Sequence, residues 1–574
     1  MNIDMDRRTF LAAALGSAGL LVLGGCSSDD DGGSASPTTG RAAEELKPAP
    51  RPTLRLSGGD QGYPSPFGYR RGGGYVQMSY LYDTLLWKDS TGAVLPWLAA
   101  SFRQSPDGLT HTFELRDNLR WHDGRPLTPE DVVFTFQYFA AQRAAGKLSQ
   151  QIIVEPVSDI AEVRATGPRT VEFRLRAPVA TFLQFGGAGA IPIVPKHIWE
   201  GIDNASAASD TKLLIGSGPY RLESYSAGEG SYLYTANDDY FLGRPFVRRI
   251  ENRPAGGDPA ADLNALQAGQ LDAGSASGVR PEVLEPFKRD SAFEVLQEPP
   301  GASQTALYWN LRKGGALADV RFRQACCRAI DRNDLVRRLF GGSATAGNPG
   351  WIPPESPWFA RVEQYPFDVA MANKMLDDAG YRRPTPDGVR ETTDGQPLRF
   401  SLLVTTPPAP VTDVLIAALK AIGVELRAEA VDTPTFNQRV IRGDSELSLI
   451  GSGGVNSDLA VDYLRLVYNS KATLTQKAQG YANPEIDDLT QKQLNTVDEA
   501  ERKRIVARIQ EIIAREVPLL PLFYPVSFSI VRKATFDQWY ITPGGAAGVI
   551  PTIANKQAFV TGLKTGVKVR PTQP

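Results

Sequence analysis

The sequence predicts an α/β protein with more than one domain, and three observations support this prediction. The chain has 574 residues, which is more than one hydrophobic core usually organises. Strand-like and helix-like segments alternate from Thr53 onward. The 54 glycines and 43 prolines indicate many turns between short elements, rather than a bundle of long helices.

The first 26 residues have the pattern of an export signal. The letters "RRTFL" from Arg7 are typical of a twin-arginine signal, and an apolar run then reaches Leu23. The following "GGC", which ends at Cys26, resembles a lipoprotein box in which the cysteine receives a lipid. A transmembrane anchor is the alternative, but the run is short for a span of about 20 residues and glycines interrupt it.

Residues 27–52 are predicted to be a flexible tether, because Ser27–Gly40 is polar, rich in glycine and serine, and without a helical or strand period. No later segment is long and apolar enough to span a bilayer. We therefore expect a lipid-anchored protein on the extracytoplasmic face of the cell membrane.

The body begins with three segments of recognisable period. The letters "TLRLSGG" from Thr53 predict a strand, and Tyr75–Trp87 has apolar residues at helical spacing. In Gly108–Arg116 apolar and polar residues alternate as in a strand, which places His111 on the same face as Phe113. We therefore interpret His111 as a residue of a strand face.

The stretch "LRWHDGRPLTPEDVVFTF", Leu119–Phe136, looks at first like a catalytic or metal-binding cluster. Its parts fit structural roles instead. The "HDG" letters from His122 are a turn signal, and Thr128 with the following proline is a helix start. The two acids after that proline lie where the helix dipole favours negative charge, and Asp131 can complete a capping box. We expect His122 to pack and form hydrogen bonds away from any ligand.

Later segments complete the α/β pattern. Helices are predicted within 319–342, with a new cap near Asp331, and within 367–381 and 498–518. Strands are predicted by "PLRFSLLVTT", "VELRAEAV" and "LSLIGSGG". The adjacent Cys326 and Cys327 are expected to be reduced and partly in the core.

Composition and motifs argue against an enzyme and against nucleic acid. There are 62 basic and 64 acidic residues, for a net charge of −2, which gives no signal for an anionic partner. The sequence contains no GxSxG, phosphate loop, HExxH or strand-linked GxGxxG motif. The chain has only three histidines, and none lies in a nucleophile context. We expect neither a resident metal nor a cofactor.

Five separate blocks resemble one family, the family-five extracellular solute-binding proteins of ABC importers that bind peptides, nickel or oligosaccharides. The blocks run in the family's order over roughly Thr53 to Tyr540. They are Phe113–Phe136, "GSGPYRLESY" from Gly216, Leu307–Arg332, "FDVAMANKMLDDAGY" from Phe367, and "VPLLPLFY" from Val517. Five ordered blocks make the resemblance specific, where one alone would be weak.

The resemblance implies a two-lobed periplasmic-binding-protein type II fold with an extra N-terminal subdomain, the cluster C arrangement. Residues 53–300 would form lobe one with the subdomain inserted at about 90–200. Residues 301–520 would form lobe two, and residues 521–574 would return to lobe one. The lobes would close on a solute and dock on a permease whose ATPase is a separate chain. We expect a monomer that touches the membrane only through its anchor.

The predicted ligand site combines both lobes. Peptide binders of this family hold the ligand's amine with an aspartate, because a desolvated ammonium needs a carboxylate partner. The matching segment here has Asn456 in that place and Asp458 two residues further on. Either Asp458 substitutes, or the ligand has no amine. The remaining expected contacts are Tyr63, Phe67, Tyr69, Tyr75, Asn310, Trp351, Gly453 and Gly454.

The solute itself stays open between two classes. A peptide is the first candidate, and an oligosaccharide, glycoside or other organic solute is the alternative, since aromatic rings such as Trp351 and Trp358 suit both. A nickel–histidine complex is disfavoured because no histidine follows His197. A secreted hydrolase is the alternative of another class.

Overall fold

The computed structural model describes residues 53–571, with gaps at 70–72, 89–92, 149–158, 185–186, 255–258, 299–302, 383–384, 407–408, 454–457, 472–478, 540, 547–549, 553, 555 and 560–569. The leader, Cys26 and the tether therefore lie outside the described residues. Within the described part, helices and strands alternate along the chain, as predicted.

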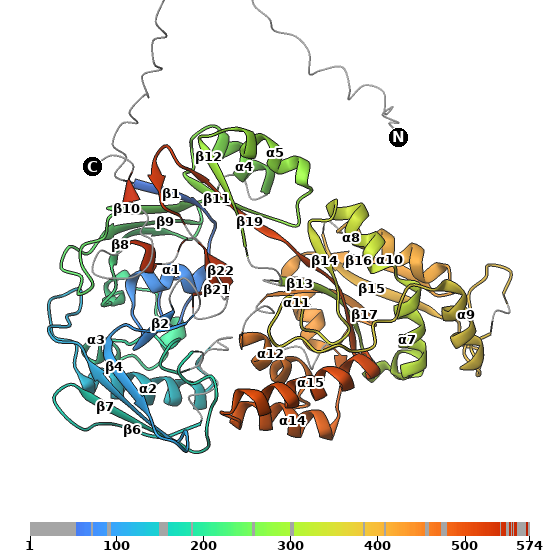
Figure 1. Ribbon diagram of the computed structural model, residues 1–574, viewed down its shortest axis with the longest axis horizontal. Coiled ribbons are helices and arrows are strands. Elements are labelled where there is room, and N and C mark those ends of the chain that lie inside the picture. The colour runs from blue at the N-terminus through green and yellow to red at the C-terminus, as the bar shows by residue number, and fades with distance from the viewer. Residues whose placement is uncertain are drawn as a thin grey trace, which may run out of the picture. The chain divides into compact units, whose positions relative to one another are not determined.

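In the described part of the chain, a seven-stranded mixed sheet forms the first lobe (Figure 1). Its strand order is β12-β19-β11-β1-β10-β9-β8, and β1 runs parallel to both of its neighbours. The strands are β1 (Thr53–Ser57), β8 (Tyr220–Ser226), β9 (Ser231–Ala236), β10 (Arg249–Arg253), β11 (Ala273–Ser277), β12 (Phe293–Gln297) and β19 (Ser527–Arg532). Helices α4 (Pro259–Gln267) and α5 (Pro281–Arg289) pack against β11 and β12.

The second lobe has a six-stranded sheet among the described residues, in the order β14-β18-β13-β17-β15-β16. Its strands are β13 (Ser303–Trp309), β14 (Ala344–Ala346), β15 (Arg399–Thr405), β16 (Glu425–Val431), β17 (Leu447–Gly453) and β18 (Leu519–Pro525). The chain leaves the first sheet after β12 and returns to it between β18 and β19, at Val526. The second sheet thus reaches a few residues beyond the boundary at 520 that the sequence suggested.

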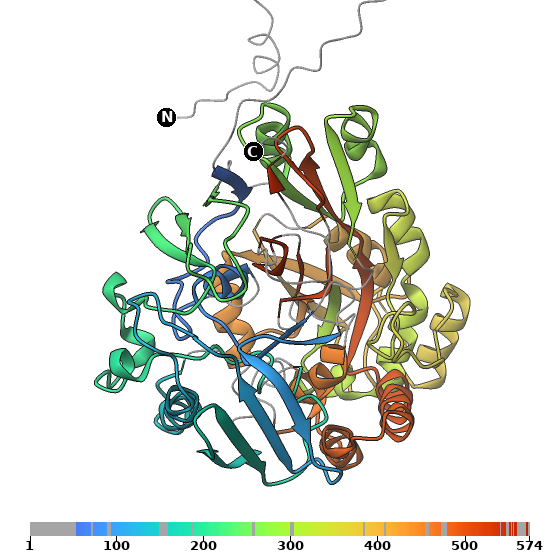
Figure 2. The same ribbon diagram turned by 60° about the vertical axis from the view of Figure 1, so that its left-hand side comes forward.

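A four-stranded antiparallel sheet and helix α2 (Pro129–Ala144) form an insertion in the first lobe. Figures 1 and 2 both place this sheet, drawn in blue to teal, far from β12. The strands are β4 (Ala99–Gln104), β5 (Thr110–Leu115), β6 (Ile160–Ala165) and β7 (Thr170–Leu175). In β5 the side chains of His111 and Phe113 are buried, so the predicted strand face is confirmed.

The helices of the second lobe begin and end largely where their caps predict. Helices α7 (Val320–Ala329) and α8 (Arg332–Phe340) are separated at Asp331, whose side chain accepts the Asp334 amide. Helix α8 ends at Gly341 in the left-handed conformation, which glycine adopts without steric cost. The reduced Cys326 and Cys327 are buried in α7, as predicted.

The remaining helices cover the faces of the second sheet or pack on each other. Apart from the four-residue α6 (Gly315–Ala318), those described are α9 (Val369–Asp378), α10 (Val411–Lys420), α11 (Thr433–Arg442), α12 (Asp458–Tyr468), α14 (Pro484–Asn495) and α15 (Glu499–Glu516). Helix α15 lies within the helix predicted at 498–518, and its four isoleucines 505, 509, 512 and 513 form a buried apolar stripe. None of the helices in the described ranges combines the length and apolar character that a membrane span requires.

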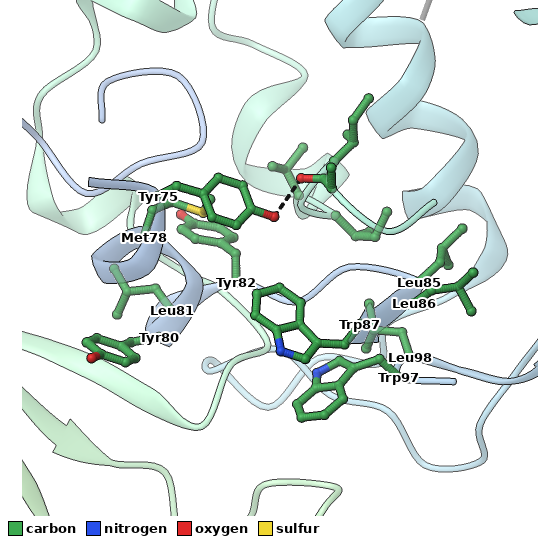
Figure 3. Packing of buried hydrophobic residues seen from close by; sticks show 14 of the residues in the cluster. Tyr75, Met78, Tyr80, Leu81, Tyr82, Leu85, Leu86, Trp87, Trp97 and Leu98 are labelled. Carbon is green, nitrogen blue, oxygen red and sulfur yellow. Dashed lines mark hydrogen bonds between the residues drawn. The ribbon is translucent and has the colours of Figure 1, made fainter. Parts of the chain in front are cut away.

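One helix prediction was partly wrong. Helical spacing covered Tyr75–Trp87, but α1 (Gly73–Leu81) ends at Leu81 and a short strand, β2 (Leu86–Lys88), follows. Every residue of α1 from Gly74 onward is buried. The helix therefore has no polar face, and the sequence pattern does not change where the helix ends. Figure 3 shows the packing around it, with Trp87 and Trp97 at a ring-centroid distance of 5.9 Å.

Candidate functional site

A pocket of about 250 Å³ lies in the first lobe, where β1 ends. Ser57 and Gly58 line it together with Ala273 and Ser275 of β11 and Gln77 of α1. β11 begins opposite Leu56 and therefore continues past the end of β1. Open α/β sheets bind ligands at the carboxyl ends of their parallel strands, so this position is the expected one for a solute.

Three polar side chains at the pocket are largely withdrawn from water. Gln77 is 5% exposed, Asn252 is 6% exposed and Glu298 is 8% exposed. The Gln77 Oε1 and Asn252 Oδ1 atoms are buried and have no hydrogen-bond partner within the described structure. Buried polar groups are normally paired, so two unpaired acceptors at one pocket point to a missing donor.

Glu298 adds negative charge to the pocket. One of its carboxylate oxygens, Oε1, accepts the Ser529 hydroxyl at 3.1 Å. No lysine, arginine or histidine is among the described residues that line the pocket. Burial raises the pKa of Glu298, and the Ser529 hydrogen bond opposes that rise. The described lining of the pocket is therefore rich in acceptors and contains no positively charged side chain.

The four N-terminal aromatic residues of the sequence prediction lie elsewhere in the first lobe. Phe67 is fully buried against Trp199, with ring centroids 4.7 Å apart. Tyr75 is 1% exposed, and its hydroxyl donates to the Ala190 carbonyl at 2.8 Å, the dashed line in Figure 3. Tyr69 packs edge-on against Tyr75, and the Tyr63 hydroxyl donates to the Asp210 carbonyl. None of the four is among the residues that line the pocket, so their contact with a ligand stays a prediction.

The predicted second-lobe residues are likewise engaged or undescribed. The Asn310 side chain is 1% exposed and donates to the carbonyls of Gly443 and Ser445, at 3.0 and 2.7 Å. Trp351 is fully buried against Tyr468. Gly453 ends β17. Gly454 and Asn456 lie outside the described residues, as does the Asp458 side chain at the start of α12. Their role at the site stays a prediction.

The cluster around His122 has the structural role that its sequence predicted. The His122 ring is buried between two backbone groups: Nδ1 accepts the Gly216 amide at 3.2 Å, and Nε2 lies 3.0 Å from the Gly218 carbonyl. This arrangement fits a neutral ring with its proton on Nε2. The contact joins two of the sequence blocks that carried the family resemblance.

Asp131 performs the capping function predicted for it. Its carboxylate accepts the Thr128 amide at 3.0 Å, which is the reciprocal half of the capping box. It also accepts the Lys196 amide at 2.9 Å and the Trp121 indole at 3.3 Å. Within the described ranges, no group of three or more histidine, cysteine, aspartate or glutamate residues is arranged to hold a metal ion.

Stability is expected to fall between pH 7.5 and 5 through His122. Burial lowers the pKa of this ring from 6.5 to about 4, despite the Gly218 hydrogen bond. Between these two values the unfolded chain binds a proton that the folded protein does not, so acid favours unfolding. At pH 5 the contribution lost is about 2 kcal/mol.

Urea unfolding of the wild type and of His122→Gln at both pH values measures this contribution. The stability difference between the two proteins should shrink by that amount at pH 5, because His111 and the acids titrate in both. Parallel pH profiles for the two proteins would contradict the prediction.

Sequence reasoning missed the residues that line the pocket. Gln77 lies on a helix that is buried on all sides, and Asn252 and Glu298 lie on or just after strands of ordinary pattern. The one local signal was a polar residue at a buried position, such as Gln77 within the apolar run Tyr75–Leu81. Such a residue is informative only once its burial is known.

The fold and the pocket are those of an α/β binding protein with two sheets. The chain passes between the sheets twice, after β12 and between β18 and β19. Residues 93–473 match the family model of the bacterial extracellular solute-binding proteins, family 5. The match covers more than half of the chain, and the protein belongs to this family. The family resemblance inferred from the five blocks is therefore confirmed.

Relatives of known sequence agree with this membership. A Brucella ovis protein named as an ABC transporter peptide-binding protein is 29% identical over 390 residues, which are 67% of this chain and 69% of the relative. The oligopeptide-binding protein AppA of Bacillus subtilis is 25% identical over 457 residues, 78% of this chain and 81% of that protein. The relatives are transport proteins rather than enzymes.

Solved structures share the two-lobed fold. NikZ from Campylobacter jejuni, in complex with Ni(L-His), has a TM-score of 0.74 and 25% identity, over 87% of this chain and 98% of that one. AppA from Bacillus subtilis, in complex with a nonapeptide, has a TM-score of 0.71 and 21% identity, over 86% and 98%.

Proposed function

We propose that this protein captures a solute between its two lobes outside the cytoplasm, and delivers it to an ABC permease for import. A peptide is the first candidate for the solute. The leader pattern supports export by the twin-arginine route and a lipid on Cys26, which would hold the protein at the membrane through residues 27–52. The permease and its ATPase subunits are separate chains in this proposal.

The pocket at the end of β1 is the observation that carries the proposal. It lies on the first sheet beside the two places where the chain passes to and from the second sheet. A solute held there and touched by the second lobe gains contacts only when the lobes are closed. That difference in affinity is what shifts the lobes toward the closed state.

The relatives favour a peptide over an oligosaccharide. Both sequence relatives described above are named for peptide binding. The rings that the sequence offered for stacking on a sugar, Trp351 and Trp358, are 0% and 6% exposed. Trp358 lies under the Arg502 guanidinium, 5.1 Å from the ring centroid. An oligosaccharide therefore remains the second candidate, on weaker support.

The full-length protein, purified in detergent from its native source, tests the function directly. Mass spectrometry of the solute released on denaturation should detect peptides. Adding that peptide fraction back to the emptied protein should raise its melting temperature, without any cleavage of the peptides. A released sugar would favour the second candidate, and turnover of the added peptides would contradict the binding-protein proposal.

A further inference from the structure

Glu298 is a buried carboxylate with no cationic partner among the described residues. It follows β12 directly, it is 8% exposed, and its described side-chain partner is the Ser529 hydroxyl. A carboxylate removed from water needs a cation or several donors to offset the loss of hydration. The described lining of the pocket supplies hydroxyl and amide groups but no cation.

Two amide side chains that line the same pocket strengthen the case for a donor. Gln77 Oε1 and Asn252 Oδ1 are buried at the same pocket as Glu298, and neither atom has a hydrogen-bond partner among the residues that the structure describes. Either amide can present its NH₂ group when it is turned over, whereas an ionised carboxylate can only accept. Whatever ligand group faces Glu298 must therefore donate, and it gains most if it is positively charged.

We propose that the pocket binds a protonated amine of the solute, with Glu298 as its counter-ion and with Gln77 and Asn252 as further acceptors. This inference rests on the proposed function. It assigns recognition of the ligand's positive charge to the first lobe, whereas the sequence offered either Asp458 in the second lobe or a ligand without an amine. An uncharged asparagine at position 456 suits a protein that holds the ammonium elsewhere.

Glu298 also lies where the chain passes between the two sheets, after β12. The Glu298 amide donates to the Ser527 carbonyl at 2.8 Å, so the exit from β12 is bonded to the entry into β19. After β12 the chain enters the second sheet at β13, and it leaves that sheet after β18, just before β19. An ammonium bound by Glu298 therefore lies next to both connections between the lobes.

Pools of tripeptides test the inference, one unmodified and one N-acetylated. Each pool is incubated with the emptied full-length protein, and the bound fraction is measured by mass spectrometry. The wild type should enrich peptides with a free α-amine, and acetylated peptides only where a lysine supplies the amine. Glu298→Gln should reduce this enrichment about 30-fold or more, the usual size of losing one member of a buried charge pair.

Glu294→Gln is the matched control, because Glu294 lies on β12, the strand that Glu298 directly follows, but does not line the pocket. It should bind as the wild type does. The melting temperature of Glu298→Gln without ligand should be equal to or above that of the wild type, since a buried charge is removed. That result separates a lost ligand contact from a misfolded protein.

Two outcomes overturn the inference, and they leave the function distinguishable. If the wild type enriches peptides but acetylation and Glu298→Gln change nothing, the protein binds peptides without this amine site. If no peptide is enriched, the peptide proposal fails, and 1,5-diaminopentane becomes the probe. A rise in melting temperature with this diamine in the wild type, absent in Glu298→Gln, would support the amine site; no rise in the wild type would overturn it.

Discussion

Lys556→Met is expected to lower the free energy of unfolding by about 3–5 kcal/mol. The Lys556 ammonium is fully buried and lies 2.6 Å from the Asp83 carboxylate. It also donates to the Tyr82 carbonyl at 2.9 Å and lies 4.4 Å from the ring centroid of Trp87. Methionine keeps most of the apolar stem but leaves Asp83 buried without its cation, which is the costly part.

The environment of Asp83 explains why the pair is maintained in a core. Its carboxylate also accepts the Trp97 indole at 2.8 Å, the Tyr240 hydroxyl at 2.9 Å and the Ser217 hydroxyl at 2.9 Å. The partners of the Asp83 carboxylate thus come from segments that are far apart in the sequence. Lys556 thereby attaches the short helix Lys556–Phe559 to the segment between α1 and β2 that contains Asp83.

Urea unfolding of Lys556→Met and of the control Lys533→Met measures the effect. Lys533 is exposed, and its replacement should change stability by less than about 0.5 kcal/mol. Combining Lys556→Met with Asp83→Asn should cost less than the sum of the two single changes, because both remove the same pair. Additive costs, or a stable Lys556→Met protein, would contradict the prediction. Solute affinity should fall as well, because Ala554, two residues before Lys556, lines the pocket. Its carbonyl accepts the hydroxyl of Tyr80, another lining residue.

Gly216→Ala is expected to destabilise the protein by at least about 3 kcal/mol, at the upper end for overpacking. A Cβ at this position would lie 1.8 Å from the Leu81 carbonyl oxygen, which belongs to the backbone at the end of α1. A neighbouring side chain could rotate away, but a carbonyl in this position cannot move without shifting the helix. Gly218 makes a similar approach, since its Cβ would lie 2.3 Å from the Tyr80 oxygen.

The close approach has a structural purpose in the first lobe. The Gly218 amide donates to the Leu81 carbonyl at 2.8 Å, and the Gly216 amide donates to His122. An added methyl group would separate these partners and move α1, which carries Gln77. Thermal and urea unfolding of Gly216→Ala test this, with Gly201→Ala as the control. A Cβ at Gly201 would meet no atom within 4 Å beyond its chain neighbours, so this replacement should be nearly neutral. Equal stability of the two variants would refute the steric argument.

The sequence by itself determined the local elements and the family of this protein. Isoleucines at helical spacing specify α15, and alternating residues specify β5, because hydrogen-bonded helices and strands impose fixed periods on the side chains that face the core. The capping bond in which the Thr128 amide donates to the Asp131 carboxylate could be predicted from four residues of sequence. The ordered blocks then indicated the family, and the family implied the two lobes.

Only the tertiary structure decided which residues line the pocket. Gln77, Asn252 and Glu298 come from elements that are far apart in the chain, and they share a cavity because β1, β10 and β11 pair and α1 packs beside them. No local period reports such a cavity. In the same way, Phe67, Tyr75 and Trp351 could have faced solvent or core, and packing against distant partners placed them in the core. The sequence reports which face a side chain takes, whereas the space between distant elements depends on how they pack.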